Sequence, residues 1–271
     1  LYEDAKNSAE NALLLNPNNS MAHAVKAWAL SFLGQYPEAI VSIQEALKLD
    51  ANNAAAYAYY TEILIDQGNY DDIEIAISMS QKALAINDKI WDLHYSLGVV
   101  YRLNGEFDLA TQEMLAAIAF NPENPDIPTD LSRSYAAQGQ FGKAVQYAEQ
   151  AVKVAPSNPR LHGNLGFMYY KNKELDKAIY HLTLAVRGGT TQDGIVVEGL
   201  PLQPGRVADE YYSFYGLALA KEGRCNDAVP VFQLILQNIA ADQTAFYNAN
   251  EGIAYCQEQL GTPQPLNSGN P

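Results

Sequence analysis

A period of 34 residues is the feature that most constrains this chain. The stretch Trp91–Asn124 holds two amphipathic helical patterns, separated by a break at Asn104-Gly105 and ended by Asn121-Pro122. Glycine accepts the left-handed backbone of a tight turn, and proline cannot continue a helix interior. The stretch therefore predicts a helix, a turn and a second helix. Neither helix can bury its apolar face alone, so the unit requires similar neighbours.

The same spacing recurs along almost the whole chain. Two columns of mostly small residues, seven positions apart in each second helix, share the steps 34, 37, 34, 34, 34 and 50. Glycine marks the turn in most units, and Lys173 takes its place once. The first column consists of Ala5, Ala39, Ala76, Ala110, Ala144, Ala178 and Ala228, and the second of Ala12, Ala46, Ala83, Ala117, Ala151, Ala185 and Ile235.

At these positions the chain resembles the tetratricopeptide repeat family, whose members repeat a helix–turn–helix unit every 34 residues. His94 departs from the family pattern, which has tryptophan there. The resemblance implies an all-α fold, a right-handed superhelix of helix pairs, and a role as an interaction scaffold. In Trp91–Asn124 it rests on Leu97, Gly98, Tyr101, Ala110, Met114, Ala117 and Pro122.

We expect residues 1–260 to form one solenoid, followed by a flexible tail at 261–271 that is rich in Pro, Gly, Asn and Ser. Because residue 1 falls inside a repeat, we also expect the sequence to be a piece of a longer protein. The expected parts are a half repeat at 1–19, full repeats at 20–53, 54–90, 91–124, 125–158, 159–208 and 209–242, and a capping helix at 243–260.

The period is interrupted at two places. Three extra residues fall around Asp71–Glu74, and the segment Gly188–Ala208 supplies 16 more than a standard step. In that segment Asp193-Gly194 is a turn signal, and Ile195-Val196-Val197 favours extended structure. We expect an ordered loop or a short β-hairpin. It would narrow one edge of the groove, form a contact site of its own, or be a decoration without function.

The sequence shows no catalytic constellation, metal site or cofactor motif, and we expect a protein that is not an enzyme. His23, His94 and His162 share the fourth position of their repeats with aromatic residues, which indicates a packing role. They lie in different repeats and are too far apart to share a metal ion. His181 stands alone in a second helix. No glycine-rich phosphate loop and no nucleophile elbow is present.

The charge balance narrows the class of partner. The chain has 31 acidic and 17 basic residues, a net charge of -14. This argues against a nucleic-acid backbone or an anionic membrane as the main partner, although solubility alone also explains an acidic surface. No apolar run approaches the roughly 20 residues of a membrane span. The partner we expect is a protein or a peptide.

The two cysteines predict a link at the end of the repeats. Cys225 opens the second helix of the last repeat, and Cys256 lies near the end of the capping helix. Successive helices run antiparallel, so the start of one lies beside the end of the next, within disulfide range. The alternative is two buried thiols. A disulfide would favour a periplasmic or cell-surface location, and free thiols would favour the cytoplasm.

The family resemblance also implies which side chains would bind a partner. In this family the first helix of each repeat lines the concave groove. Aromatic and Arg side chains are typical of binding hot spots, although some of these aromatics would simply pack between repeats. The alternatives to partner binding are a structural spacer, a self-association module, or the regulatory arm of an enzyme encoded upstream. Carried over by position, the inward-facing residues include Asp66, Asp92 and Asp130, and those expected to bind a partner are Trp28, Tyr59, Glu62, Tyr95, Arg102, Arg133, Asn164, Phe167, Tyr170 and Lys171.

Overall fold

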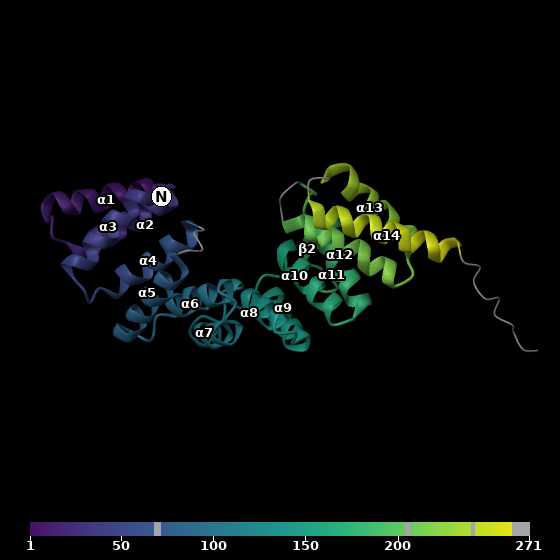
Figure 1. Cartoon of the computed structure of the whole chain (residues 1–271), viewed down its shortest axis with the longest axis horizontal. Helices are drawn as coiled ribbons and strands as arrows, with labels where there is room; N and C mark the ends of the chain where they lie inside the picture. The colour runs from purple at the N-terminus through teal and green to yellow at the C-terminus, as the bar shows by residue number, and fades with distance from the viewer. Residues whose placement is uncertain (68–71, 204–206, 240–241, 262–271) are drawn as a thin grey trace, which may run out of the picture. The chain divides into compact units, whose positions relative to one another are not determined.

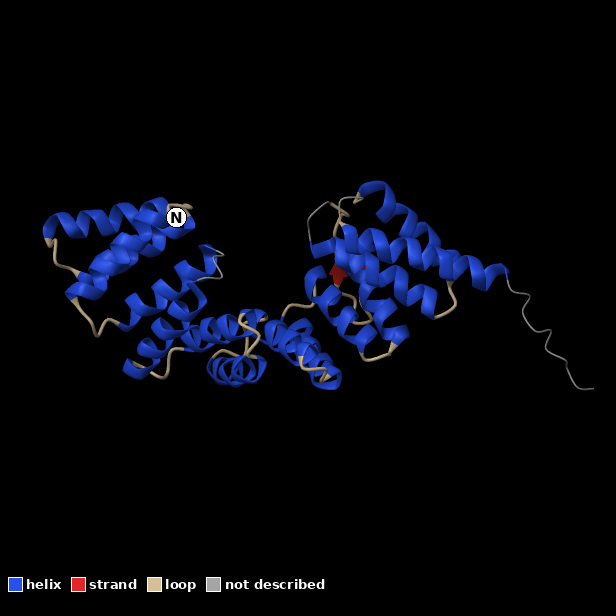
Figure 2. Cartoon of the chain, viewed as in Figure 1, coloured by secondary structure: helices blue, strands red, loops and turns tan. Residues whose placement is uncertain are grey.

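The computed structural model describes residues 1–67, 72–203, 207–239 and 242–261, which form fourteen helices and a two-stranded sheet (Figures 1 and 2). The predicted all-α repeat fold is confirmed. The helices are α1 (Tyr2–Leu15), α2 (Ser20–Phe32), α3 (Tyr36–Leu49), α4 (Ala54–Gln67), α5 (Ile73–Ile86), α6 (Trp91–Leu103), α7 (Phe107–Phe120), α8 (Asp126–Ala137), α9 (Phe141–Val154), α10 (Pro159–Lys171), α11 (Leu175–Arg187), α12 (Val207–Lys221), α13 (Cys225–Asn238) and α14 (Gln243–Gly261).

The two columns of small residues explain how closely the helices pack. From α3 to α13, every member of either column is at most 2% exposed. Short side chains let each second helix approach its first helix, as in the packed pairs α2–α3, α4–α5, α6–α7, α10–α11 and α12–α13. The periodicity read from the sequence is therefore the periodicity of the core.

The turns between paired helices use the left-handed backbone that the sequence predicts. The φ angles of Gly34, Gly105, Gly139 and Gly223 lie between 73° and 80°. Lys173, which replaces glycine in its repeat, also adopts a positive φ of 65°. A residue with a Cβ atom pays roughly 1–2 kcal/mol for this conformation, so the surrounding helix pair imposes it. The equivalent turn at residue 68 lies outside the described residues.

The chain divides into two compact units, Leu1–Ser134 and Tyr135–Pro271. In the first unit the first helix α4 packs on both α2 and α6, and each of the three packs on its own second helix. In the second unit α10 packs on α12, and α14 packs on α12 and α13. Helix α5 starts at Ile73, within the stretch Asp71–Glu74 around which the three extra residues fall, and Asp71 lies outside the described residues. Of the tail expected at 261–271, Gly261 is instead the last residue of α14, and residues 262–271 lie outside the described residues.

The interruption after α11 contains a short β-hairpin, one of the two forms expected from the sequence. Strand β1 (Gly189–Thr190) pairs antiparallel with β2 (Val196–Val197), so that Gly189 faces Val197. The amide of Leu200 donates to the carbonyl of Ala185 at 2.8 Å, and Val197 is 2% exposed. The hydroxyl of Tyr212 in α12 also donates to the carbonyl of Leu200 at 3.1 Å. These contacts fix the segment against α11 and α12.

The last three helices are held together by a disulfide and by one aromatic ring. Cys225 in α13 is bonded to Cys256 in α14, with their Cα atoms 5.3 Å apart, so the predicted pairing is confirmed. Phe232 in α13 is fully buried between two glycines. A Cβ atom placed on Gly216 in α12 or on Gly252 in α14 would lie 2.5 or 2.3 Å from its ring. The glycines therefore make room for the ring on both sides.

Candidate functional site

The residues predicted to bind a partner lie on first helices in both units. Trp28 comes from α2, Tyr59 and Glu62 from α4, Tyr95 and Arg102 from α6, and Arg133 from α8. Those six belong to the first unit. The remaining four, Asn164, Phe167, Tyr170 and Lys171, are on α10 in the second unit.

An aromatic cluster joins three helices of the first unit. The Trp28 ring lies 6.0 Å from the Tyr59 ring and 5.1 Å from the Phe32 ring, measured between ring centroids. Tyr2 of α1 stacks on Phe32 at 4.4 Å. Aromatic pairs at these separations stabilise one another beyond their buried area. The rings of the cluster thus hold one another in place. The Phe32 side chain is still 45% exposed, so part of this apolar surface is accessible to a partner.

Beside this cluster, α2, α4, α6 and the start of α8 enclose a cavity of about 400 Å3, which we call the acidic cavity. Its walls combine aromatic and aliphatic side chains with four carboxylates. Among the described residues that line it, none is Lys, Arg or His. The lining residues are Phe32, Glu62, Ile65, Asp66, Trp91, Asp92, Tyr95, Ser96, Val99, Asn124 and Asp130.

Two residues that line the acidic cavity, Tyr95 and Asp130, belong to a hydrogen-bonded network. The Tyr95 hydroxyl donates to the Asp130 carboxylate at 2.8 Å, and Arg102 and Arg133 each approach that carboxylate at 3.5 Å. Burial and the nearby Asp130 charge raise the pKa of the Tyr95 phenol well above its ordinary value. The phenol therefore keeps its proton at neutral pH and remains a donor to Asp130.

Glu62 is in the opposite situation, because it has no basic partner. No ion pair reaches it from any residue that the structure describes, and the side chain of Trp28 favours its ionised form only weakly. Burial, followed by the charges of Asp92 and Asp66, raises the pKa of Glu62 to about 7. The ionised carboxylate is thus held where the folded chain disfavours it.

Replacing Glu62 with glutamine is expected to stabilise the chain at alkaline pH. A carboxyl whose pKa is raised on folding loses stability as the pH climbs from its unfolded pKa near 4.5 to its folded value near 7. Glutamine removes this loss, so urea denaturation should give a free energy of unfolding roughly 1–3 kcal/mol higher at pH 8 and unchanged at pH 4. The exposed Glu74 in α5 supplies the control, Glu74→Gln. Equal stabilities of wild type and Glu62→Gln at pH 8 would refute the assignment.

In the second unit, the predicted residues form an aromatic and basic patch. Phe214 of α12 lies 4.5 Å from the Phe167 ring and 5.2 Å from the Tyr170 ring. The Lys171 ammonium lies over Phe167 at 5.3 Å, a cation–π distance. Asn164 is only 3% exposed, so its side chain belongs to the interior more than to the surface.

Several residues of these two sites were absent from the predicted set. Phe32, Phe214 and Lys221 stand at repeat positions that the family resemblance assigns to the groove, so a full application of that rule finds them. The Lys221 ammonium lies 4.4 Å from the Tyr170 ring. Trp91, the first residue of its helix, and Tyr2, on a second-helix position, carry no such signal.

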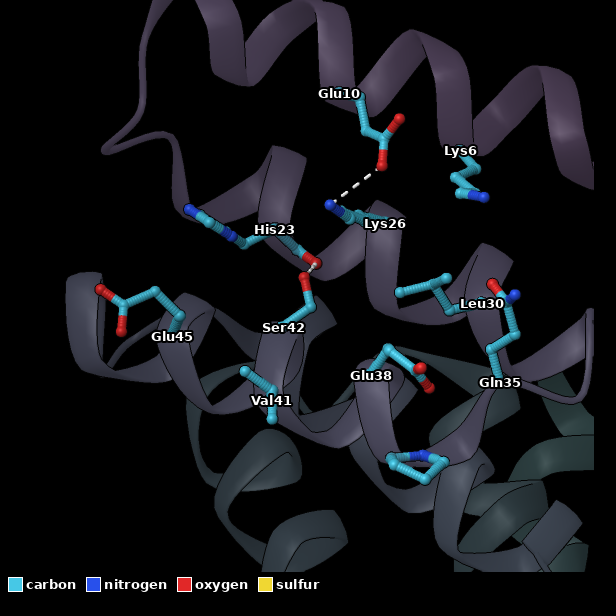
Figure 3. A pocket seen from close by; sticks show the side chains of 11 residues that line it. Lys6, Glu10, His23, Lys26, Leu30, Gln35, Glu38, Val41, Ser42 and Glu45 are labelled. Atoms are coloured by element: carbon cyan, nitrogen blue, oxygen red, sulfur yellow. Dashed lines mark hydrogen bonds and ion pairs between the residues drawn. The ribbon is translucent and has the colours of Figure 1, made fainter.

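A second cavity of the first unit, about 690 Å3, lies between α1, α2 and α3 (Figure 3). Its lining contains both acidic and basic side chains, and two of them form an ion pair with each other. Lys26 pairs with Glu10 at 3.0 Å, and the Ser42 hydroxyl donates to the carbonyl of His23 at 2.9 Å. Three basic or imidazole groups face three carboxylates in its lining, so it shows no clear charge preference.

The three histidines at the fourth repeat position share one contact. Nε2 of His23, His94 and His162 lies 3.0, 3.0 and 2.9 Å from the carbonyl oxygen six residues earlier. A carbonyl oxygen only accepts, so this nitrogen donates to the loop that precedes each helix. The contact supports the packing role predicted for these residues.

His181 is not alone, contrary to expectation. Its Nδ1 lies 2.9 Å from Nδ1 of His162, and the two rings stack at 5.2 Å. Because His162 donates through Nε2 to the carbonyl of Pro156, its Nδ1 accepts from His181 when both rings are neutral. The packing of α11 on α10 creates this pair, and no spacing in the sequence points to it.

Both histidines line a cavity of about 520 Å3 that the hairpin residues Thr191, Gln192 and Asp193 also line. None of the predicted binding residues lines it. The hairpin therefore borders a cavity separate from the acidic cavity and from the aromatic and basic patch. In the described ranges, no three His, Cys, Asp or Glu side chains are arranged to hold a metal ion.

Acid should weaken folding through this histidine pair. Burial, together with the charges of His162 and Lys177, lowers the pKa of His181 to about 4. The unfolded chain takes up a proton below about pH 6.5 while the folded chain does not, so stability is lost as the pH falls from 6.5 toward 4. Between pH 7 and pH 5 the loss is roughly 2 kcal/mol. In His181→Phe, the free energy of unfolding measured with urea should fall by that much less between pH 7 and pH 5 than it does in the wild type. An equal fall in both would contradict the expectation.

Comparison with known proteins places these features in context. Sequence profiles described as tetratricopeptide repeat match residues 9–41 and 129–193. A comparison with curated proteins finds no match. No helix in the described part of the chain combines the length and apolar character needed to cross a bilayer.

Solved structures give a broader likeness. PilF of Pseudomonas aeruginosa superposes with a TM-score of 0.66 at 15% identity, over 89% of this chain and 97% of PilF. PilW, described as a type IV pilus biogenesis factor, gives 0.61 at 22% identity over 67% of this chain and 83% of its own. YrrB, described as a TPR protein with an unusual peptide-binding site, gives 0.55 at 22% identity over 66% and 90%. At these identities the likeness concerns the fold.

Proposed function

The chain is a tetratricopeptide repeat protein, and we propose that it binds an extended segment of a partner protein along the first helices of its repeats. Because this fold typically serves as a non-catalytic interaction scaffold, the role that we propose is binding of a partner and not catalysis. The observation that carries it is the acidic cavity, which lies on first helices and lies beside a partly exposed aromatic cluster.

The aromatic residues supply the features that peptide recognition needs. Peptide-binding surfaces concentrate their free energy in a few aromatic and Arg side chains that are already rigid before binding. Trp28 and Tyr59 are fixed by ring contacts, and Tyr95 by its hydrogen bond to Asp130. These side chains lose little further freedom on binding. YrrB, a similar fold with a described peptide-binding site, is consistent with such a role.

Selection from a random peptide library tests the proposal. Peptides displayed on phage would be selected on the wild-type chain, and the best would be synthesised with a fluorescent label for anisotropy. We expect saturable binding that falls at least tenfold when Tyr95, Arg133 and Phe167 are replaced together by alanine, as hot-spot losses predict. Each variant is checked by circular dichroism and thermal denaturation.

The control variant carries three alanines at exposed apolar positions of second helices, Val41, Leu109 and Leu234. It removes comparable apolar surface away from the proposed site. Selected peptides that bind this control as tightly as the wild type, and bind the first variant weakly, support the proposal. Equal affinity for both variants, or no saturable binder from the library, would reject it.

A further inference from the structure

We propose that the acidic cavity takes the cationic side chain of a lysine or arginine in the partner segment. The inference rests on the proposed function and adds the chemical class of the residue recognised. It follows from two properties of the cavity's described lining: carboxylates without an ion-pair partner, and aromatic walls.

The negative charge comes from three different helices. Glu62 and Asp66 project from α4, Asp92 from α6 and Asp130 from α8. Only Asp130 is neutralised by arginines in the described part of the chain, and the other three carboxylates have no ion-pair partner there. A partner cation would therefore supply the charge that the protein itself does not provide.

The walls of the cavity suit a long side chain with a charged end. Phe32, Trp91 and Tyr95 line it together with Ile65 and Val99. Lysine and arginine place an apolar stem against such walls and keep the charged group next to carboxylates. An aromatic face also attracts a cation directly. An uncharged apolar side chain would bury the same walls but would leave the carboxylates unpaired.

A metal ion is a poorer occupant for this cavity. Calcium requires six to eight oxygen ligands at 2.3–2.6 Å around one point. Among the described residues, no three acidic or imidazole side chains are arranged in that way. The four carboxylates are instead distributed over a cavity of about 400 Å3. That distribution fits a large organic cation.

Glu62 is the carboxylate on which we expect the cation to act most. It lines the cavity, and burial together with the charges of Asp92 and Asp66 raises its pKa to about 7. A bound cation lowers that pKa, so binding releases a proton near neutral pH and weakens as the solution becomes more acidic. The titratable or charged groups around it are Tyr59 and Asp66 on α4, Asp92 and Tyr95 on α6, and Asp130 on α8.

The chain carries its own reporters for this cavity. It has two tryptophans: Trp91 lines the cavity, and the ring of Trp28 lies 5.1 Å from that of Phe32, which also lines it. In a nitrogen-15 correlation spectrum their indole N–H groups give two separate signals, assigned with Trp28→Phe and Trp91→Phe. The probes are N-acetyl-lysine-N′-methylamide and its uncharged analogue N-acetyl-norleucine-N′-methylamide, each titrated at pH 8 in low salt.

We expect the lysine compound to shift both indole signals saturably and the norleucine compound to shift them little. Glu62→Gln should weaken the lysine compound roughly tenfold, as loss of a charge-assisted hydrogen bond predicts, whereas Glu74→Gln should leave it unchanged. Equal shifts by norleucine, or equal affinity in Glu62→Gln, would overturn the inference. Calcium chloride that saturates the same shifts at lower concentration than the lysine compound would indicate a metal site and also overturn it.

The peptide selection separates this inference from the proposed function. Selected peptides that share a lysine or arginine, and lose affinity when it becomes norleucine, support both. Peptides that depend on Tyr95, Arg133 and Phe167 but tolerate norleucine at every basic position leave the proposed function intact and reject the cationic occupant. A saturable lysine response in the spectrum without any selected peptide would retain the cation site and reject binding of an extended segment.

Discussion

Replacing Phe232 with alanine is expected to lower the free energy of unfolding of the second unit by about 3–5 kcal/mol. The side chain is 0% exposed and belongs to α13, and it contacts the positions of Gly216 and Gly252 on two other helices. Its removal leaves a cavity that three helices border, and a helix backbone cannot collapse into such a space as a loop can. Urea denaturation measures the loss, and Leu234→Ala, 40% exposed on the same helix, should cost less than about 1 kcal/mol.

A double-mutant cycle tests the geometry behind this expectation. Gly252→Ala places a methyl group 2.3 Å from the Phe232 ring, so it should destabilise the wild-type chain strongly. In the Phe232→Ala background the same methyl group enters empty space, and its cost should largely disappear. The two substitutions are therefore expected to show a coupling energy of at least about 1 kcal/mol. Additive effects would mean that the ring does not occupy the space between these helices.

Removing the disulfide is the second change with a large expected effect. The bond joins Cys225 and Cys256, 31 positions apart, and a loop of that length gives about 3–4 kcal/mol in the chain-entropy account. The variant with alanine at both positions should lose about that much stability, seen as a lower urea midpoint for the second unit. The wild type should show the same loss in reductant.

Reductant also supplies the control for the disulfide. It should leave the double-alanine variant unchanged, because that variant has no other cysteine. Intact mass after alkylation under denaturing conditions, with and without prior reduction, reports the bond itself. Two alkylated thiols in the unreduced wild-type chain would contradict the pairing. Because the link joins α13 to α14, the loss should appear chiefly in hydrogen exchange of these last two helices.

The fold could be predicted from the sequence because each repeat needs small residues at the same positions, and this pattern occurs many times along the chain. A single buried alanine such as Ala110 does not by itself identify a repeat. Its recurrence at fixed steps identifies the helix face that needs small side chains to pack closely. The turn at Lys173 was placed by register alone, even though the residue type argues against a left-handed backbone. The cysteine pair followed from the antiparallel order of neighbouring helices.

The candidate site could be predicted only in outline. Repeat position placed Glu62 and Tyr95 on first helices, but not in one cavity with Trp91 and Asp130, because that depends on how neighbouring repeats pack. The uncompensated charge of Glu62 was equally hidden, since the sequence does not say which carboxylates an arginine reaches. The pairing of His162 with His181 also depends on packing, because it joins two facing helices.

Glu62 is expected to affect both the stability of the fold and the binding of a cation. The folded chain gives up stability to keep an ionisable carboxyl there, and glutamine is expected to remove that loss while weakening cation binding. A substitution that stabilises the fold and impairs the site is typical of functional positions. A purely structural residue would show the opposite relation, with lost stability and no defined effect on binding.

Hydrogen exchange of the wild-type chain, with and without a saturating lysine-containing peptide from the selection, tests the central claim most directly. The footprint of an extended segment on first helices should appear as slower exchange in α2, α4 and α6, with the second helices α3, α5 and α7 little changed. At a peptide concentration just sufficient to saturate the wild type, the protection should be clearly smaller in the variant with alanine at Tyr95, Arg133 and Phe167. Protection confined to second helices, or to α13 and α14, would place the partner elsewhere and contradict the account.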